Sequence, residues 1–315
     1  MSYPTLRLHP RKEESVLRFH PWIFSGAIAS FSAPVEDGDL VSVVDSKGRP
    51  LGTGHFGGGS IAVRLLSFDA EEVIDRAFYK RRVEAALRLR LSCDLVRPVG
   101  SSDSPNTTYR LVHGEGDSLP GLIIDIYDRT AVVQAHSLGM HQARQIIAEV
   151  LWEVFAEAGD PVLHLEGIYY KSETTLPTRD MRELASDGFL IGHTEAAPIY
   201  ENGVRFTPDW LKGQKTGFFI DQRDNRALVA HYAKGRTVLN AFCYTGGFSI
   251  YALHAGAKRV DSLDSSAKAM YLTEQHVALN FGADCPRHHS VTEDAFDYLE
   301  RMPEGEYDLI ILDPP

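Results

Sequence analysis

The sequence contains few cysteines and no long apolar run, and both absences limit what the protein can be. Its 315 residues include three cysteines, Cys93, Cys243 and Cys285, which form no CxxC pair and no even-numbered set. We therefore expect neither a disulfide framework nor a structural zinc site, and a reducing cytoplasm is the simplest location. No stretch of about 18 apolar residues occurs, so we expect no membrane-spanning helix and no membrane partner. The first residues also lack the apolar core of a secretion signal.

The chain is acidic overall, with a formal net charge of -11, which by itself argues against a nucleic-acid partner. The distribution is uneven, because residues 1–98 hold 14 Lys and Arg against 12 Asp and Glu, a net of +2. Local basic surface, rather than total charge, determines contact with phosphates. Within the basic stretch 76–97, Lys80, Arg81 and Arg82 are therefore candidate RNA-binding residues. A solvated helix face is the alternative explanation of the same pattern.

Hydrophobic periodicity divides the chain into four regions and predicts a multidomain fold of α/β and α+β type. Residues 1–72 read as short alternating strands between glycine turns, which is typical of a small β-barrel. Residues 73–100 have apolar positions at helical spacing with basic residues between them, which predicts a basic connector helix. Residues 101–200 combine strands with an amphipathic helix over 141–159 and are expected to form a central α/β domain. Residues 201–315 alternate strands and helices.

The last region has the element order of a nucleotide-binding α/β unit. An apolar strand at 236–242 runs into the turn CYTGGF, where Gly246 and Gly247 allow a tight turn and close approach of a ligand. The next strand ends in Asp264, an acid placed to accept hydrogen bonds from ribose hydroxyls. Asp294 ends the third strand and is placed to meet an adenine amino group.

The fourth strand ends in Asp313-Pro314-Pro315, a rigid rim that can hold a flipped base. Alone, this tripeptide is an ordinary strand-ending turn, and a glycine-rich turn also fits NAD-dependent enzymes and flavodoxin-like domains. The turn lacks a GxGxxG spaced for a pyrophosphate, which S-adenosylmethionine does not contain. The combination predicts a Rossmann-like methyltransferase that uses S-adenosylmethionine.

Several motifs resemble the bacterial large-subunit ribosomal RNA methyltransferase I family, which forms 5-methylcytosine in 23S rRNA. They are KTGFFIDQRDNR (215–226), VLNAFCYTGGFSIYAL (238–253), DSLDSSAKAM (261–270) and YDLIILDPP (307–315). RFHPWIFSGAI (18–28) looks like the family's PUA RNA-binding domain, and GEGDSLPGLIIDIYD (114–128) looks like its central domain. The resemblance thus covers nearly the whole chain.

The resemblance implies S-adenosyl-L-methionine as cofactor, no metal, and 23S rRNA outside the fully assembled ribosome as partner. It places Gly246 and Gly247 along the methionine part of the cofactor, and Asp313 between cofactor and base as the catalytic candidate. The cofactor site that it implies comprises Gln222, Arg223, Asn240, Tyr244, Thr245, Gly246, Gly247, Phe248, Asp264, Asp294 and Asp313.

The sequence departs from the family in one respect that matters for the chemistry. Cytosine C5 is a poor nucleophile until a thiolate adds to C6, and the family supplies that thiolate from a Ser-Cys-Ser segment after the fifth strand. Residues 1–315 contain four strands of the sheet and no such segment. We therefore expect them to be part of a longer enzyme, truncated after the fourth strand. Cys243 lies beside the expected cofactor, but a small buried residue beneath the turn is the commoner role.

Two other functions remain open from the sequence alone. Methylation of an exocyclic amine of adenine or guanine needs no thiol, because the amine lone pair can attack directly. A truncated chain could instead bind RNA through the PUA-like region without catalysis. Transfer of labelled methyl groups, compared with RNA retention, separates the enzyme from the binding module.

Overall fold

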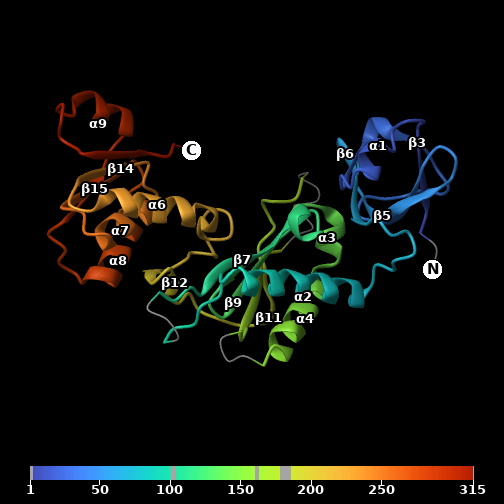
Figure 1. Ribbon diagram of the computed structural model, residues 1–315, viewed down its shortest axis with the longest axis horizontal. Helices are drawn as coiled ribbons and strands as arrows, with labels where there is room; N and C mark the ends of the chain where they lie inside the picture. Colours follow the sequence, from blue (N-terminus) through green and yellow to red (C-terminus); the bar gives the residue numbers. More distant parts are fainter. Residues whose placement is uncertain (1–2, 101–103, 160–162, 178–185, 315) are drawn as a thin grey trace. The chain divides into compact units, whose positions relative to one another are not determined.

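The computed structural model describes residues 3–100, 104–159, 163–177 and 186–314 (Figure 1). The chain forms two compact units. The first comprises Met1–Val96, Thr108–Glu195 and Trp210–Thr216, and the second comprises Arg97–Thr107, Ala196–Asp209 and Gly217–Pro315. In the described part of the chain, no helix is long and apolar enough to cross a membrane.

The first unit begins with a six-stranded sheet in the order β2-β6-β5-β4-β1-β3. Its strands are β1 (Thr5–Leu8), β2 (Trp22–Phe24), β3 (Ile28–Phe31), β4 (Leu40–Val44), β5 (Pro50–Phe56) and β6 (Ile61–Ser67), with helices α1 (Glu14–Leu17) and η1 (Ser25–Ala27) between them. Alternate residues such as Val41 and Val43 point into a small core with Leu6, Leu8 and Val63. The predicted β domain at the N-terminus is confirmed.

A second sheet in the same unit has the order β11-β10-β9-β8-β7. It is built from β7 (Thr108–His113), β8 (Leu122–Tyr127), β9 (Thr130–Ala135), β10 (Gly167–Tyr170) and β11 (Gly188–Gly192), with η2 (Gly114–Asp117), α2 (Arg76–Ser92), α3 (Leu138–Gln142) and α4 (Arg144–Glu157). Phe78, Val83 and Leu87 of α2 share a buried core with Ile147 and Leu151 of α4. The helix expected as a connector is therefore an integral layer of this domain.

The second unit contains a hairpin and a parallel sheet in the order β16-β15-β14-β17. The hairpin is β12 (Ile199–Glu201) and β13 (Val204–Phe206), followed by η3 (Ile220–Gln222) and α6 (Arg223–Ala233). The sheet alternates β14 (Thr237–Ala241), α7 (Gly247–His254), β15 (Arg259–Asp264), α8 (Ala267–Phe281), β16 (His288–Thr292), α9 (Ala295–Arg301) and β17 (Leu309–Leu312). This is the Rossmann-like arrangement expected from the sequence.

The register of the parallel sheet determines where a site can form. Ala241 of β14 lies opposite Leu263 of β15 and Leu312 of β17, and Asp264 lies opposite Thr292 of β16. The carboxyl ends of the four strands therefore meet at one edge, which is where open α/β sheets bind ligands.

Candidate active site

The turn between β14 and α7 has a backbone that few side chains tolerate. Tyr244 has φ +49° and Gly246 has φ +76°. The Gly246 N–H donates to the Cys243 carbonyl over 2.8 Å and closes the turn. A Cβ on Gly246 would lie 2.6 Å from Cγ2 of Thr273 in α8, so both the conformation and the contact require glycine.

Asp264 at the end of β15 joins this turn to the start of α8. Its Oδ2 accepts the Tyr244 N–H over 2.9 Å, and its Oδ1 accepts the Ser266 N–H over 2.9 Å. A carboxylate has about four acceptor positions, so each oxygen keeps a lone pair for a ligand hydroxyl. The carboxylate thus orients two loops and can still accept further hydrogen bonds.

Two side chains of helix α8, Thr273 and His276, form hydrogen bonds to backbone carbonyls of the turn. The Thr273 hydroxyl donates to the Tyr244 carbonyl over 3.0 Å. His276 Nδ1 lies 2.9 Å from the Thr245 carbonyl, and its Nε2 accepts the Thr207 N–H over 3.1 Å. Burial lowers the pKa of His276. Its partners therefore fix a neutral ring with the proton on Nδ1.

Asn240, expected in the cofactor site, lies wholly inside the unit with 0% exposure. Its Nδ2 donates to Ser249 Oγ over 2.9 Å, and Ser249 Oγ lies 2.7 Å from Ser262 Oγ. Its Oδ1 has no hydrogen-bond partner within the described chain. This position makes Asn240 a support that ties α7 to β14 and β15.

Asp294 begins α9 as its N-terminal cap. One carboxylate oxygen, Oδ1, accepts the N–H groups of Phe296 at 2.9 Å and Asp297 at 3.2 Å. The ring of Phe296 is 67% exposed and stands edge-on to Phe242, with 5.9 Å between centroids. A carboxylate and an exposed aromatic face thus lie together beyond the end of β16.

The structure brings Gln222 and Asp313 together although they are 91 positions apart. Gln222 Nε2 lies 3.5 Å from Asp313 Oδ2, while its Oε1 accepts from Asn225 Nδ2 over 2.6 Å. Arg223 follows at the start of α6, with a side chain that is 15% exposed. Its Nη1 is buried without a hydrogen-bond partner in the part of the chain that the structure describes. Pro315, the last residue of the predicted rim, lies outside the described residues.

Two further predicted residues flank the turn. Thr245 is 8% exposed, and its carbonyl is the acceptor for His276. Phe248 lies half-buried in the first turn of α7, next to Gly247.

Cys243 is unsuited to nucleophilic attack. It is 6% exposed, and its sulfur lies 3.5 Å from Met270 Sδ. Burial raises the pKa of its thiol to about 12, so the reactive thiolate is scarce at neutral pH. Cys93 is exposed on the other unit, and Cys285 precedes β16.

The basic residues of α2 are paired with carboxylates of the same unit. Lys80 Nζ donates to Glu153 over 2.6 Å and to Glu157 over 2.7 Å, and these bonds raise its pKa. Arg81 bonds Glu72 over 2.8 Å, and Arg82 lies 3.4 Å from the other oxygen of that carboxylate. The side chain of Arg81 is 55% exposed and that of Lys80 is 25% exposed. Lys80 is therefore less accessible to a phosphate than Arg81.

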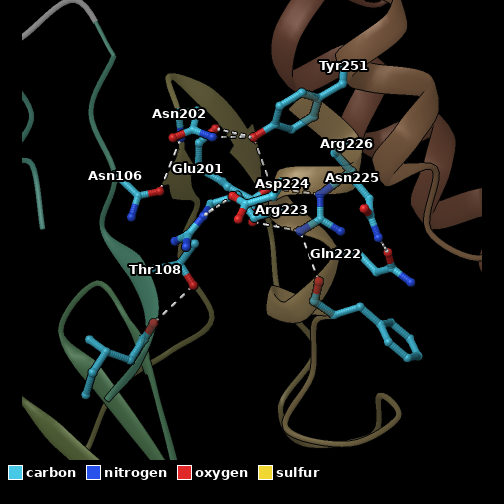
Figure 2. A network of polar contacts seen from close by, with 12 residues as sticks. Asn106, Thr108, Glu201, Asn202, Gln222, Arg223, Asp224, Asn225, Arg226 and Tyr251 are labelled. Carbon is cyan, nitrogen blue, oxygen red and sulfur yellow. Dashed lines mark hydrogen bonds and ion pairs between the residues drawn. The ribbon is translucent and has the colours of Figure 1, made fainter. Parts of the chain in front are cut away.

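Sequence reasoning missed Glu201, Arg226 and Tyr251, which form a buried polar group beside the turn (Figure 2). The motif around Arg226 was visible in the sequence, but its partner Glu201 lies 25 positions earlier, in a short hairpin that carries no chemical motif.

Comparison with known proteins agrees with this geometry. Residues 6–68 match the family model of a PUA-like domain, and residues 178–315 match that of an S-adenosylmethionine-dependent methyltransferase. A solved structure from Streptococcus mutans, described as a SAM-dependent methyltransferase, superposes with a TM-score of 0.80 at 25% identity, covering 100% of this chain and 77% of the other. A methyltransferase complexed with S-adenosylhomocysteine has the same fold, with a TM-score of 0.80 at 24% identity over 100% of this chain and 76% of that one.

The fold and the strand-end residues together define an S-adenosylmethionine-dependent methyltransferase with an N-terminal PUA-like domain. Several relatives carry the name ribosomal RNA large subunit methyltransferase I. The one from Alteromonas mediterranea is 38% identical over 314 residues, covering 98% of this chain and 74% of the relative. The one from Shewanella amazonensis is 39% identical over 316 residues, covering 98% and 75%. The chain belongs to the ribosomal RNA large subunit methyltransferase I family, and S-adenosylmethionine is its cofactor.

Proposed function

We propose that this protein methylates C5 of a cytosine in 23S rRNA, acting in the cytoplasm on RNA outside the fully assembled ribosome. One observation carries the proposal: the turn 243–247, Asp264, Asp294 and Asp313 lie at, or just beyond, strand ends that are in register at one edge of the sheet. The names of the relatives give ribosomal RNA as the substrate class.

The residues at this edge fit the three parts of the cofactor, which supplies the methyl group. The turn that includes Gly246 and Gly247 can accommodate the methionine chain, and the guanidinium of Arg223, the first residue of α6, is the proposed partner of its carboxylate. Asp264 keeps acceptor capacity for the ribose hydroxyls. Asp294, with the exposed ring of Phe296 beside it, suits the adenine amino group and face.

Asp313 is the catalytic candidate, since it is exposed at the end of β17 next to Gln222. A base flipped onto this rim meets a carboxylate that can accept the cytosine amino group and orient the ring. Methylation at C5 then requires a thiolate to form a bond to C6, which turns C5 into an enamine-like nucleophile. After methyl transfer, a base removes the C5 proton and the thiolate leaves C6.

The cysteines of this chain do not supply that thiolate. Cys243 is buried with a raised pKa, and Cys93 belongs to the other unit. Cys285 precedes β16 by a few residues, at the opposite end of that strand from Asp294. The family resemblance implies a cysteine nucleophile, and we propose that it is none of these three.

RNA contact on the first unit is proposed for Arg81 and Arg82, with Lys80 as a weaker contributor. Arg81 and Arg82 share the single carboxylate of Glu72, so among the residues that the structure describes one positive charge of the pair is not compensated by an ion pair. Lys80 faces two carboxylates, which reduces its attraction for phosphate.

The test is methyl transfer by the full protein from labelled S-adenosylmethionine to 23S rRNA, followed by digestion to nucleosides. We expect label in 5-methylcytidine, and we expect Asp313→Asn to abolish transfer while Cys243→Ala retains it. Label in an N-methylated adenosine or guanosine would instead establish exocyclic-amine chemistry, which needs no thiol. RNA binding without transfer would identify a binding module.

A further inference from the structure

We propose that Arg226, held by Glu201 and Tyr251, is a positioning residue that fixes the two walls of the cofactor site against each other. The inference rests on the proposed cofactor site at the turn 243–247. Arg226 does not belong to the strand-end residues, and its role follows from its contacts alone.

Arg226 and Glu201 form a two-pronged ion pair in the interior of the second unit (Figure 2). Arg226 Nε donates to Glu201 Oε1 over 2.7 Å, and Nη2 donates to Oε2 over 2.7 Å. The side chains are 3% and 0% exposed. The Tyr251 hydroxyl from α7 adds a third hydrogen bond to the Glu201 carboxylate, which its Oε1 accepts over 3.0 Å.

Stability alone is a poor explanation for such a group. Removing two charges from water is costly, and well-packed apolar side chains are often at least as stable as a buried ion pair. What a bidentate pair adds is a fixed direction for the remaining N–H groups and for the atoms packed around the guanidinium.

The first wall that Arg226 holds is the segment leading into η3. Its Nη2 also donates to the Phe219 carbonyl over 3.0 Å, and its guanidinium lies 4.6 Å from the centroid of the Phe218 ring. This segment continues directly to Gln222 and Arg223, which are both proposed to face the cofactor.

The second wall is the glycine turn itself. A Cβ placed on Gly247 would lie 3.1 Å from Cδ of Arg226, so the arginine stem packs directly on the start of α7. The ring of Phe219 meets the ring of Tyr244 edge-on, with 5.4 Å between centroids. One side chain therefore contacts both the segment 218–219 and the turn, and sets the spacing between Arg223 and Gly246.

The test compares two conservative variants by calorimetric titration with S-adenosylmethionine. Arg226→Lys keeps the charge that Glu201 needs, but its donors share one nitrogen and cannot reproduce the two-pronged pair together with the bond to the Phe219 carbonyl. We expect its Kd for S-adenosylmethionine to rise about tenfold, the loss of roughly one charge-assisted hydrogen bond. Tyr251→Phe removes one hydroxyl from the group, and we expect a rise of about threefold. The KM for RNA should not change in either variant.

Arg90→Lys is the matched control, because Arg90 forms a comparably buried arginine pair, with Asp117 in the first unit. We expect it to lower the unfolding temperature like Arg226→Lys but to leave the Kd for S-adenosylmethionine unchanged. Should Arg226→Lys fail to fold, Tyr251→Phe decides the question alone.

Asp264→Asn separates the two possible failures. If it weakens cofactor binding while Arg226→Lys and Tyr251→Phe bind as the unaltered protein does, the positioning role is overturned and the cofactor site stands. If Asp264→Asn also binds normally, the cofactor lies elsewhere and the proposed site itself is wrong. Equal losses of RNA and cofactor affinity in Arg226→Lys would indicate general loosening and would also overturn the inference.

Discussion

The residues that shape the turn after β14 combine an unusual backbone with close contacts. Phe242, Tyr244 and Gly246 all have positive φ values, of +57°, +49° and +76°. Such a conformation costs a residue other than glycine about 1–3 kcal/mol and is retained where the surroundings stabilise it. Here Thr273 and Asp264 supply that stabilisation through hydrogen bonds to both sides of Tyr244.

Gly246→Ala should destabilise the protein and weaken cofactor binding. The new Cβ would meet Thr273 Cγ2 at 2.6 Å, in addition to its unfavourable φ of +76°. Gly256 has φ +88°, and no atom of the described residues lies within 4 Å of its added Cβ, so Gly256→Ala isolates the cost of the backbone alone. We expect urea unfolding to show a loss of about 1 kcal/mol for Gly256→Ala and a larger loss for Gly246→Ala. Equal losses of unfolding free energy in the two variants would mean that Thr273 moves away from the new Cβ without cost.

Cysteine labelling should distinguish the exposed thiol from the buried one. At pH 8, iodoacetamide should modify Cys93, which is exposed, and leave Cys243 intact in the folded protein. The reason is that burial raises the pKa of the Cys243 thiol to about 12 and also blocks access to it. Mass spectrometry of tryptic peptides measures both sites, with denatured protein as the positive control. Rapid modification of Cys243 in the native state would contradict the buried position.

At the scale of elements, the sequence predicted those segments whose pattern is local. The strand ending in Asp264 and the turn with Gly246 and Gly247 were identified because apolar runs and glycines carry their own signal. The amphipathic helix expected over 141–159 corresponds to α4, Arg144–Glu157, and the short α3 that ends just before it at Gln142 was not indicated by periodicity. The hairpin β12–β13 was missed, since each strand has only three residues.

The support of the turn by α8 should be sensitive to pH through His276. Burial lowers the pKa of His276 in the folded protein below its ordinary value of 6.5. The unfolded chain therefore binds a proton more readily, and the free energy of unfolding should fall as the pH decreases below about 6.5.

His276→Asn can keep the bond to the Thr245 carbonyl and cannot titrate. Urea denaturation between pH 5 and pH 7.5 should show that the free energy of unfolding decreases less with falling pH in this variant than in the unaltered protein. Because His55 and His288 also have lowered pKa values, near 4, only the difference between the two proteins reports on His276. If the free energy of unfolding depends on pH in the same way in both proteins, His276 does not contribute to the pH dependence.

At the scale of the whole molecule, the remaining features depended on pairings between distant segments. The basic character of 76–97 was evident, but the pairing of Lys80 with Glu153 and Glu157 followed only once α2 and α4 were packed together. The pair of Arg226 with Glu201 escaped prediction for the same reason. Composition gives the charge of each part of the chain and leaves open which charges compensate one another.

RNA affinity should depend on salt, and part of the dependence should arise from the basic side chains of α2. Replacing Arg81 and Arg82 by Gln should weaken binding and flatten the plot of log Kd against log salt, by roughly 0.7–0.9 for each phosphate that is no longer neutralised. Neutral replacements avoid adding a charge next to Glu72. Lys258→Gln, an exposed change in the other unit, is the control and should leave the slope unchanged. An unaltered slope in the double variant would remove α2 from the RNA-binding surface.

The position of β17 in the sheet also affects how the protein is made. Thr237 at the start of β14 bonds to Asp308, which is 71 positions later in the chain. At a synthesis rate of about 5–20 residues per second, roughly 4–14 s pass between the emergence of these partners from the ribosome. During this interval one side of β14 exposes unpaired backbone groups to other nascent chains. Slow codons between the two strands would prolong that exposure. A chaperone that shields the growing chain would reduce contact between the unpaired strand and other nascent chains.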